Sequence, residues 1–201
     1  MPPRKIIRVV SASKFIPAKD AISPLAYMKS SLSARGINFT TKKYDSLLDT
    51  FFEKTGEDDV NAYGLDVLDA VRRGDVEQLR AYHKEGRTLK CSNKFGESLL
   101  HLACRKGLTS VVDFLVNEAQ VPVQVVDDMG RSPAHDAFWA AKPNFKLISM
   151  VLKKCPDLLY VSDKRGDIPT SYCRKEHWET WINFFKEEPT LLLPRKLLSL
   201  K

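Results

Sequence analysis

A short segment recurs along the chain at an almost constant interval, and this recurrence limits the possible folds more than any other feature. The segment that begins at Gly96 returns at Gly130, which is 34 residues later, and again at Gly166, which is 36 residues later still. A more degraded copy lies upstream, over residues 65–86. An interval of this length is typical of supersecondary units that stack into a linear array.

The residues of each unit predict two short helices that follow a turn. Gly96 supplies the positive φ that a tight turn needs. Ser98 is placed to cap the first helix, Gly107 to end it, and Thr109 to cap the second helix, whose apolar residues follow at helical spacing. Neither helix can bury its apolar face alone, so the sequence predicts that neighbouring units stack.

The segments 96–116 and 130–152 carry the pattern Gly-x-[Ser/Thr]-[Pro/Leu]-x-His-x-Ala before an apolar run. This pattern resembles the ankyrin repeat. The resemblance implies an all-α solenoid of stacked helix-turn-helix repeats joined by short β-hairpin-like loops, in which His101 ties neighbouring loops together by hydrogen bonds. We expect a repeat domain over residues 63–187, with units at about 65–90, 91–124, 125–160 and 161–186.

The third unit departs most from the pattern. The expected turn glycine after Ala137 is missing, and a Pro-Asn turn takes its place, with Asn144 as the expected cap of the next helix. Phe138 is predicted to lie in the core. Two interpretations of Trp139 stay open, because an exposed tryptophan is a common anchor in protein interfaces and a buried one would fill the gap left by the altered turn.

The chain outside the repeats divides into three segments. Residues 1–20 are predicted to be a disordered basic arm, and residues 21–62 a helical extension with an acidic linker. Within the extension, a helix over 45–52 is expected to shield the outer face of the first unit, or alternatively to dock on a partner. Residues 188–201 form a leucine-rich tail, which either covers the aromatic second helix of the fourth unit or binds another protein.

Charge is distributed unevenly along the chain, whose formal net charge is +7. Residues 1–43 carry nine Lys or Arg and one acid, whereas residues 44–69 carry one base and eight acids. The basic arm suits nucleic acid or acidic lipid, but equally suits the neighbouring acidic segment or solvent, and no nucleic-acid motif accompanies it. No apolar run reaches the length of a transmembrane helix.

These features predict an intracellular protein, either cytoplasmic or nuclear. The basic N-terminus has too short an apolar run for a signal peptide, and a transit peptide is a less favoured alternative. The four cysteines are expected to be reduced, packed thiols, because they lack the spacing of metal ligands. No cofactor or metal is expected. His135 and Asp136 make a poor catalytic dyad, because adjacent residues on a helix point in different directions.

The favoured function is therefore noncatalytic protein binding, as an adaptor, scaffold or regulator. Binding of nucleic acid or acidic lipid through the arm is an alternative, and an enzyme on a repeat scaffold is less favoured. By the resemblance, a partner protein would meet the hairpin tips and the inner helices, where the cations favour an acidic, apolar-studded partner or are merely solvated. The tip residues are Lys94, Phe95, Asp128, Met129, Lys164 and Arg165, and the inner-helix residues are Arg105, Lys106, Trp139, Arg174 and Lys175.

Overall fold

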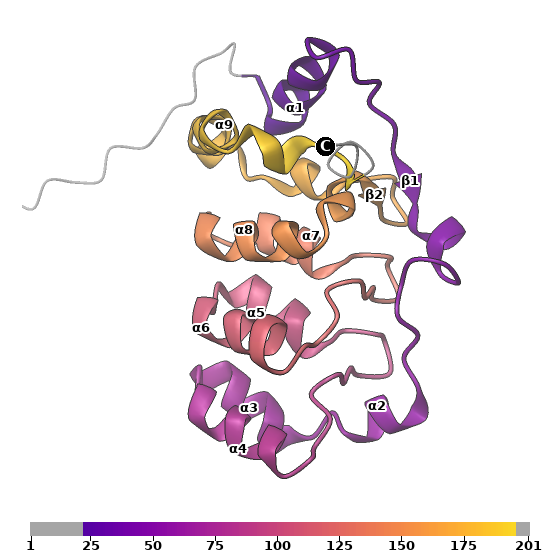
Figure 1. Ribbon diagram of the computed structural model, residues 1–201, viewed down its shortest axis with the longest axis vertical. Helices are drawn as coiled ribbons and strands as arrows, with labels where there is room; N and C mark the ends of the chain where they lie inside the picture. Colours follow the sequence, from indigo (N-terminus) through magenta and orange to yellow (C-terminus); the bar gives the residue numbers. More distant parts are fainter. Residues whose placement is uncertain (1–21, 196–201) are drawn as a thin grey trace, which may run out of the picture.

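The computed structural model describes residues 22–195, which form a stack of helical units with an N-terminal segment along one side (Figure 1). The described residues are mainly helical, and the predicted all-α solenoid is confirmed. The units consist of α3 (Leu65–Arg73) with α4 (Val76–Lys84), α5 (Leu99–Lys106) with α6 (Thr109–Asp113), α7 (Pro133–Trp139) with α8 (Phe145–Lys154), and two 3-10 turns, Pro169–Tyr172 and Lys175–His177, with α9 (Trp178–Glu187).

Short polar side chains begin the helices, mostly as the sequence predicts. The Asp75 carboxylate accepts a hydrogen bond from the backbone N–H of Gln78 and caps α4, and Asn144 caps α8 in the same way. Ser98 caps α5. The prediction for Thr109 is wrong, because it is the first helical residue of α6, whose cap position is held by Leu108 without a side-chain bond.

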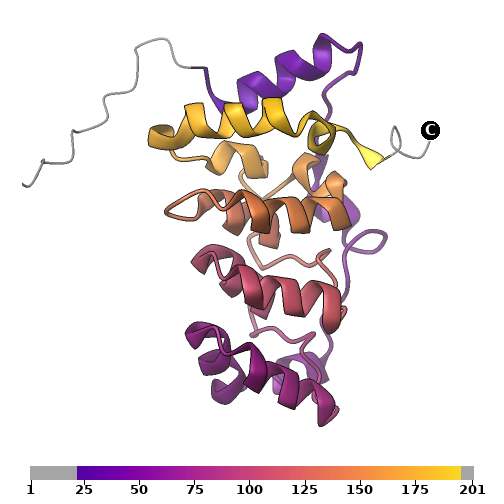
Figure 2. The same cartoon turned by 60° about the vertical axis from the view of Figure 1, so that its left-hand side comes forward.

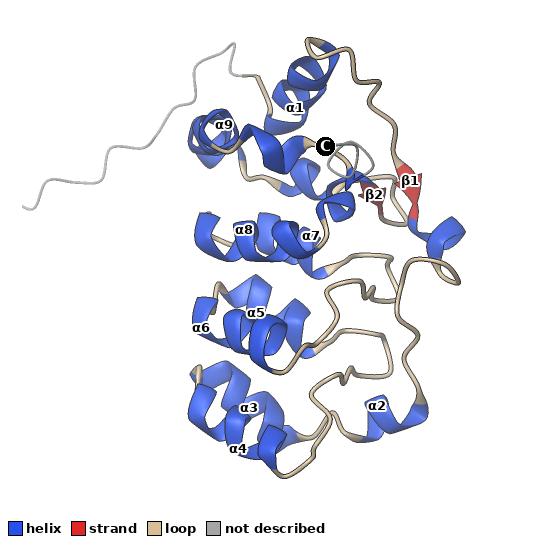
Figure 3. Ribbon diagram, viewed as in Figure 1, coloured by secondary structure: helices blue, strands red, loops and turns tan. Residues whose placement is uncertain are grey.

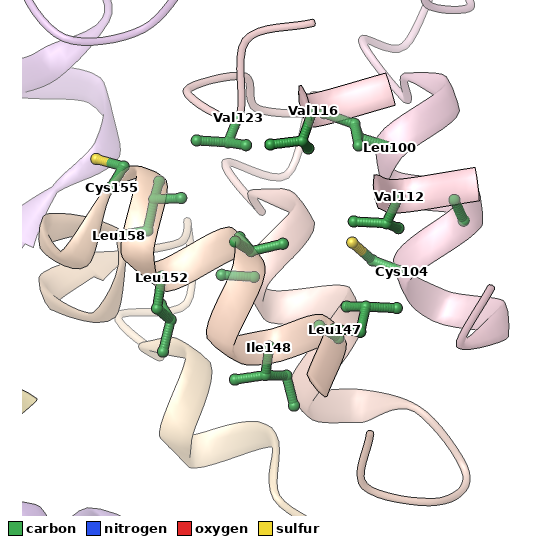
Figure 4. Packing of buried hydrophobic residues seen from close by; sticks show 14 of the residues in the cluster. Leu100, Cys104, Val112, Val116, Val123, Leu147, Ile148, Leu152, Cys155 and Leu158 are labelled. Atoms are coloured by element: carbon green, nitrogen blue, oxygen red, sulfur yellow. The ribbon is translucent and has the colours of Figure 1, made fainter. Parts of the chain in front are cut away.

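The core is continuous from one unit to the next. Figure 4 shows Leu100, Cys104 and Val112 of the second unit on one side, with Leu147 and Ile148 of the third unit near them. Small side chains, Ala103 and Ala137, are buried on the inner helices α5 and α7 and allow these helices to approach each other. All four cysteines are buried within this stack and form no disulfide, and burial raises the pKa of the Cys91 thiol to about 12.

The N-terminal helix lies at the opposite end of the stack from the first unit. Helix α1 (Pro24–Ser33) packs against α9 (Figure 2). Its Met28 and Leu32 side chains are completely buried. The chain then runs back along the loops to α2 (Glu57–Asn61), which precedes the first unit. The predicted shielding of the first unit by a helix over 45–52 is therefore wrong. That segment forms one 3-10 turn, Tyr44–Leu47, followed by irregular turns.

We call residues 38–59 the strap, because its backbone bonds to the loops of successive units. Strand β1 (Lys42–Lys43) pairs in parallel with β2 (Val161–Ser162) beside the fourth unit (Figure 3). Farther along, the N–H of Glu53 donates to the Gln124 carbonyl at 2.8 Å, and the Asp59 carbonyl accepts from Ser92 at 3.3 Å. These bonds fix the strap on either side of the segment 45–52, which between them forms short turns instead of the predicted helix.

The strap also approaches one hairpin loop too closely for any side chain there. Gly130 has a φ of 74°, and a Cβ atom on it would lie 2.5 Å from the Tyr44 ring. Glycine is therefore needed at this position both for the turn and for the contact with the strap.

The aromatic second helix of the fourth unit is covered from two directions. Leu191 and Leu192 of the tail are buried beside it, and the Tyr160 hydroxyl donates to the Leu192 carbonyl. Helix α1 supplies the rest of the cover. The intramolecular interpretation of the tail is thus confirmed for these two leucines, whereas residues 196–201 and the basic arm, residues 1–20, lie outside the described residues. No helix within residues 22–195 is long and apolar enough to cross a membrane.

We expect the Leu32→Ala substitution to lower the free energy of unfolding by about 2–4 kcal/mol, although Leu32 lies far outside the repeats in sequence. The reason is that its side chain is fully buried where α1 packs on the fourth unit. Chemical denaturation followed by circular dichroism measures the change. Leu48→Ala on the strap is the control, because Leu48 is exposed. Equal effects of the two substitutions would contradict the placement of α1.

Candidate functional site

Three hairpin loops project from the stack, and the same bonds build each of them. In each loop the backbone N–H of the first residue donates to the carbonyl of the residue four positions later: Asn93 to Glu97, Asp127 to Arg131, and Asp163 to Asp167. The first side chain also accepts two backbone N–H bonds inside its own loop. Sequence reasoning missed these side chains, although an Asn or Asp three residues before each loop glycine was the available signal.

Histidines tie each loop to the next. His101 Nδ1 accepts from the Ser98 N–H, so Nε2 carries the proton and donates to the Arg131 carbonyl at 2.8 Å. His135 reaches the Asp167 carbonyl in the same way, at 3.2 Å. The structural role that the resemblance implies for His101 is confirmed. In the fourth unit Tyr172 takes the place of the histidine and donates to Asp163.

We expect stability to fall as the pH is lowered from about 6.5 to 4, because burial lowers the pKa of His135 to about 4. The unfolded chain, with a histidine pKa near 6.5, binds the proton first in this window, so acid favours unfolding. This histidine alone should lower the free energy of unfolding by about 3 kcal/mol over this pH range.

Urea denaturation across this pH range measures the effect, with the His135→Gln variant as comparison because glutamine does not titrate there. The wild type should lose more stability than the variant. An identical pH dependence in the two proteins would contradict burial of the neutral imidazole.

The predicted tip residues form a continuous row. The N–H of Asp128 donates to the Phe95 carbonyl at 2.7 Å, and the N–H of Lys164 donates to the Met129 carbonyl at 2.9 Å, so each tip is bonded to the next. The Phe95 side chain is exposed, with the Lys94 ammonium 5.1 Å from the ring centre. Lys94, Asp128, Lys164 and Arg165 are also exposed, whereas Met129 is half-buried.

Trp139 and Phe138 have opposite surroundings despite being neighbours. Phe138 is buried and stacks on Trp181 with ring centres 4.5 Å apart, so its prediction as a core residue is confirmed. The Trp139 side chain is 47% exposed, and Arg174 lies over its ring at 5.8 Å. Trp139 is therefore not a buried gap filler, and its use as an anchor for a partner stays a prediction.

A hollow of about 280 Å³ lies between α7 and the loops of the third and fourth units. It contains charged groups of both signs together with the exposed indole. Its lining residues are Met129, Arg131, His135, Asp136, Trp139, Asp163, Arg165 and Tyr172. We call the hollow and the row of tips together the inner face.

Arg105 is not the free cation that the sequence suggested. Its guanidinium donates two hydrogen bonds of 3.1 Å to the Asp136 carboxylate, which is buried, and it also pairs with Glu97. The partner acid lies 31 residues away, which is close to one repeat interval, so the pairing is hidden in a linear reading of the sequence. Lys106 and Lys175 are exposed and form no ion pair within residues 22–195.

We expect the Arg105→Met substitution to lower the free energy of unfolding by about 2–4 kcal/mol, because it leaves the Asp136 carboxylate buried without its partner. The neighbouring Lys106→Met substitution should change stability by less than about 0.5 kcal/mol, because Lys106 is exposed. Denaturation curves of the two variants make this comparison. Similar curves would show that the ion pair does not hold the inner helices together. If Arg105→Met is the less stable variant, as expected, charge reversal at Arg105 would disturb folding rather than binding.

His135 and Asp136 are both fully occupied by structural bonds. Both ring nitrogens of His135 bond within the loop network, and the Asp136 carboxylate holds Arg105. Their arrangement leaves no group of this pair directed at a substrate. Within residues 22–195, no three His, Cys, Asp or Glu side chains gather as metal ligands would.

Comparison with known proteins places the likeness in the repeats. The family model for ankyrin repeats, in three copies, matches residues 67–158. The chain is 33% identical over 73 residues to "Putative glutaminase 2" of Caenorhabditis elegans, and 36% identical over 53 residues to "Eye-specific diacylglycerol kinase" of Drosophila melanogaster. These matches cover 36% and 26% of this chain, but only 12% and 4% of the two relatives.

Proposed function

We propose that this chain, whose residues 67–158 are ankyrin repeats, is a noncatalytic protein-binding module that holds a partner protein on its inner face. Ankyrin repeats are generally protein-interaction modules, and stacked repeats offer extended surfaces for such contacts. Within this proposal the protein acts as an adaptor, scaffold or regulator. The exposed Trp139 side chain beside a hollow is the observation that supports it best.

Several features of the inner face favour a protein partner. Tryptophan and arginine are the residues that most often dominate binding energy in interfaces, and Trp139 lies under Arg174. Phe95 adds a second exposed aromatic ring on the row of tips. No strap residue lines the hollow, so the strap leaves that part of the inner face open.

The charges of the inner face refine the kind of partner that would fit. Of the charged groups that line the hollow, Arg131 is paired with Asp127 and Asp136 with Arg105, which leaves the exposed Arg165 to meet an acidic group of a partner. With Arg105 already paired, the proposed preference for an acidic partner depends on Lys106, Arg174 and Lys175.

The enzyme names of the two relatives are not carried over to this chain. Each relative is much longer than the part that matches, and the matches lie in the repeats. A shared repeat segment supports a shared mode of binding rather than a shared reaction.

Affinity capture tests the proposal with a Phe95→Ser, Trp139→Ser double variant. Hot-spot residues contribute about 2 kcal/mol or more each to binding, so the affinity of the variant for the partner should fall by more than tenfold. Cytosolic and nuclear extracts are both used, because either location belongs to the proposal.

The control is Leu48→Ser, which removes an exposed apolar side chain from the strap instead of the inner face. Circular dichroism first confirms that all variants are folded. Recovery of the same proteins by the double variant and the wild type would refute binding through the inner face.

A further inference from the structure

A second recess lies where the inner helices end, away from the hairpin loops. It is a cleft of about 600 Å³ between the end of α5, the turn after α7 and the start of α8. The Pro-Asn turn that replaces the usual glycine forms one wall. The charged residues that line it are Arg105, Lys106, Lys142 and Lys146, and no acidic residue from the described part of the chain, 22–195, lines it. We call this recess the lysine cleft.

The positive charge of the lysine cleft is not balanced by the protein around it. Arg105 is paired with Asp136 and Glu97, but the three lysines are exposed and form no ion pair within residues 22–195. Like charges close together repel one another, so a bound anion would relieve this repulsion. Lys146 adds to it, because it lies in the first turn of α8 and that turn carries no acid.

The walls of the cleft are fixed before any partner arrives. The Asn144 side chain donates to the Gly107 carbonyl at 3.1 Å and to the Thr109 hydroxyl at 2.7 Å, which joins the second unit to the third. Across the turn, His177 Nε2 lies 3.1 Å from the Ala141 carbonyl. A preorganised cleft loses little conformational entropy when it binds, which favours affinity.

The remaining lining is apolar. Pro143 and Phe145 are half-buried in the cleft, and one face of the Phe145 ring stacks on Phe184 at 4.3 Å. That contact fixes the ring and takes up a face on which a nucleic-acid base would otherwise stack. A recess that has both lysines and an apolar floor fits a peptide with acidic and apolar side chains better than it fits a flat lipid surface.

We propose that the lysine cleft binds an acidic segment of the partner protein. Carboxylates of that segment would lie beside Lys106, Lys142 and Lys146, and an apolar side chain would pack on Pro143. Trp139 lines the hollow and the next residue, Ala140, lines the cleft, so the two recesses are close enough for one partner to contact both. This inference rests on the proposed binding function and specifies the chemistry of the segment that is bound.

The test uses a fluorescein-labelled peptide of Glu and Asp with two leucines, compared with a matched peptide of Gln and Asn. Fluorescence anisotropy measures binding to the full chain at about 50 mM salt, where charge interactions are weakly screened. The acidic peptide should bind and the neutral one should not. Amide signals of residues 106–107 and 140–146 should shift in a nuclear magnetic resonance titration.

Charge reversal then locates the site. The Lys106→Glu, Lys142→Glu, Lys146→Glu variant should bind the acidic peptide about tenfold or more weakly, because three favourable charge contacts become repulsive. The control reverses Lys84, Lys153 and Lys186, which are also exposed, so the net charge changes by the same amount. The control should bind within about twofold of the wild type. Circular dichroism confirms the fold of both variants.

Equal loss of binding in the two variants would overturn the inference, because net charge would then explain it. So would equal binding of the neutral peptide, or tighter binding of phosphatidylserine vesicles than of the acidic peptide. These results are separable from failure of the proposed function. Capture that depends on Trp139, without acidic-peptide binding at the cleft, refutes only the inference, whereas peptide binding at the cleft with capture independent of Trp139 refutes only the inner-face proposal.

Discussion

The burial of each unit by its neighbours is the constraint on which the rest of the structure depends. A pair of short helices has too little apolar surface to fold alone, so every internal unit is stabilised on both sides and the two ends are exposed by default. The last unit ends in α9, whose Trp181, Phe184 and Phe185 pack on aromatic rings of the third unit. The other side of α9 has no further unit to bury it and needs a cover. Helix α1 from the other end of the chain provides that cover, together with Leu191 and Leu192 of the tail.

This closure explains the course of the strap. Because α1 lies on the fourth unit and α3 begins the first, the chain between them must travel the length of the stack. It does so along the loop edge, where backbone N–H and carbonyl groups need partners. The bonds from β1, Glu53 and Asp59 to three successive loops satisfy those groups. The strap thus helps to order the base of the same loops whose tips form the proposed binding surface.

The sequence predicted the parts of the fold that depend on local residues or on the repeat interval. The glycine turns, the caps at Ser98 and Asn144 and the tie made by His101 all belong to this class. The position of α1 could not be predicted in this way. An apolar stripe on a helix indicates that one face is buried, but it does not indicate which surface buries that face. The pairing of Arg105 with Asp136 was missed for a related reason, since it joins two units and is absent from either one alone.

The same distinction bears on where binding would occur. Residues that recur in each unit, such as His101, His135 and the loop Asn or Asp residues, have their polar groups occupied by bonds within the stack. The segment that breaks the repeat, from Trp139 to Asn144, instead presents an exposed indole and an unbalanced Lys142. Asn144 and His177 hold the backbone of this segment in place from both sides. A surface with a fixed backbone and exposed groups that lack partners loses little entropy when it binds, so it favours binding of a partner more than the repeated residues do.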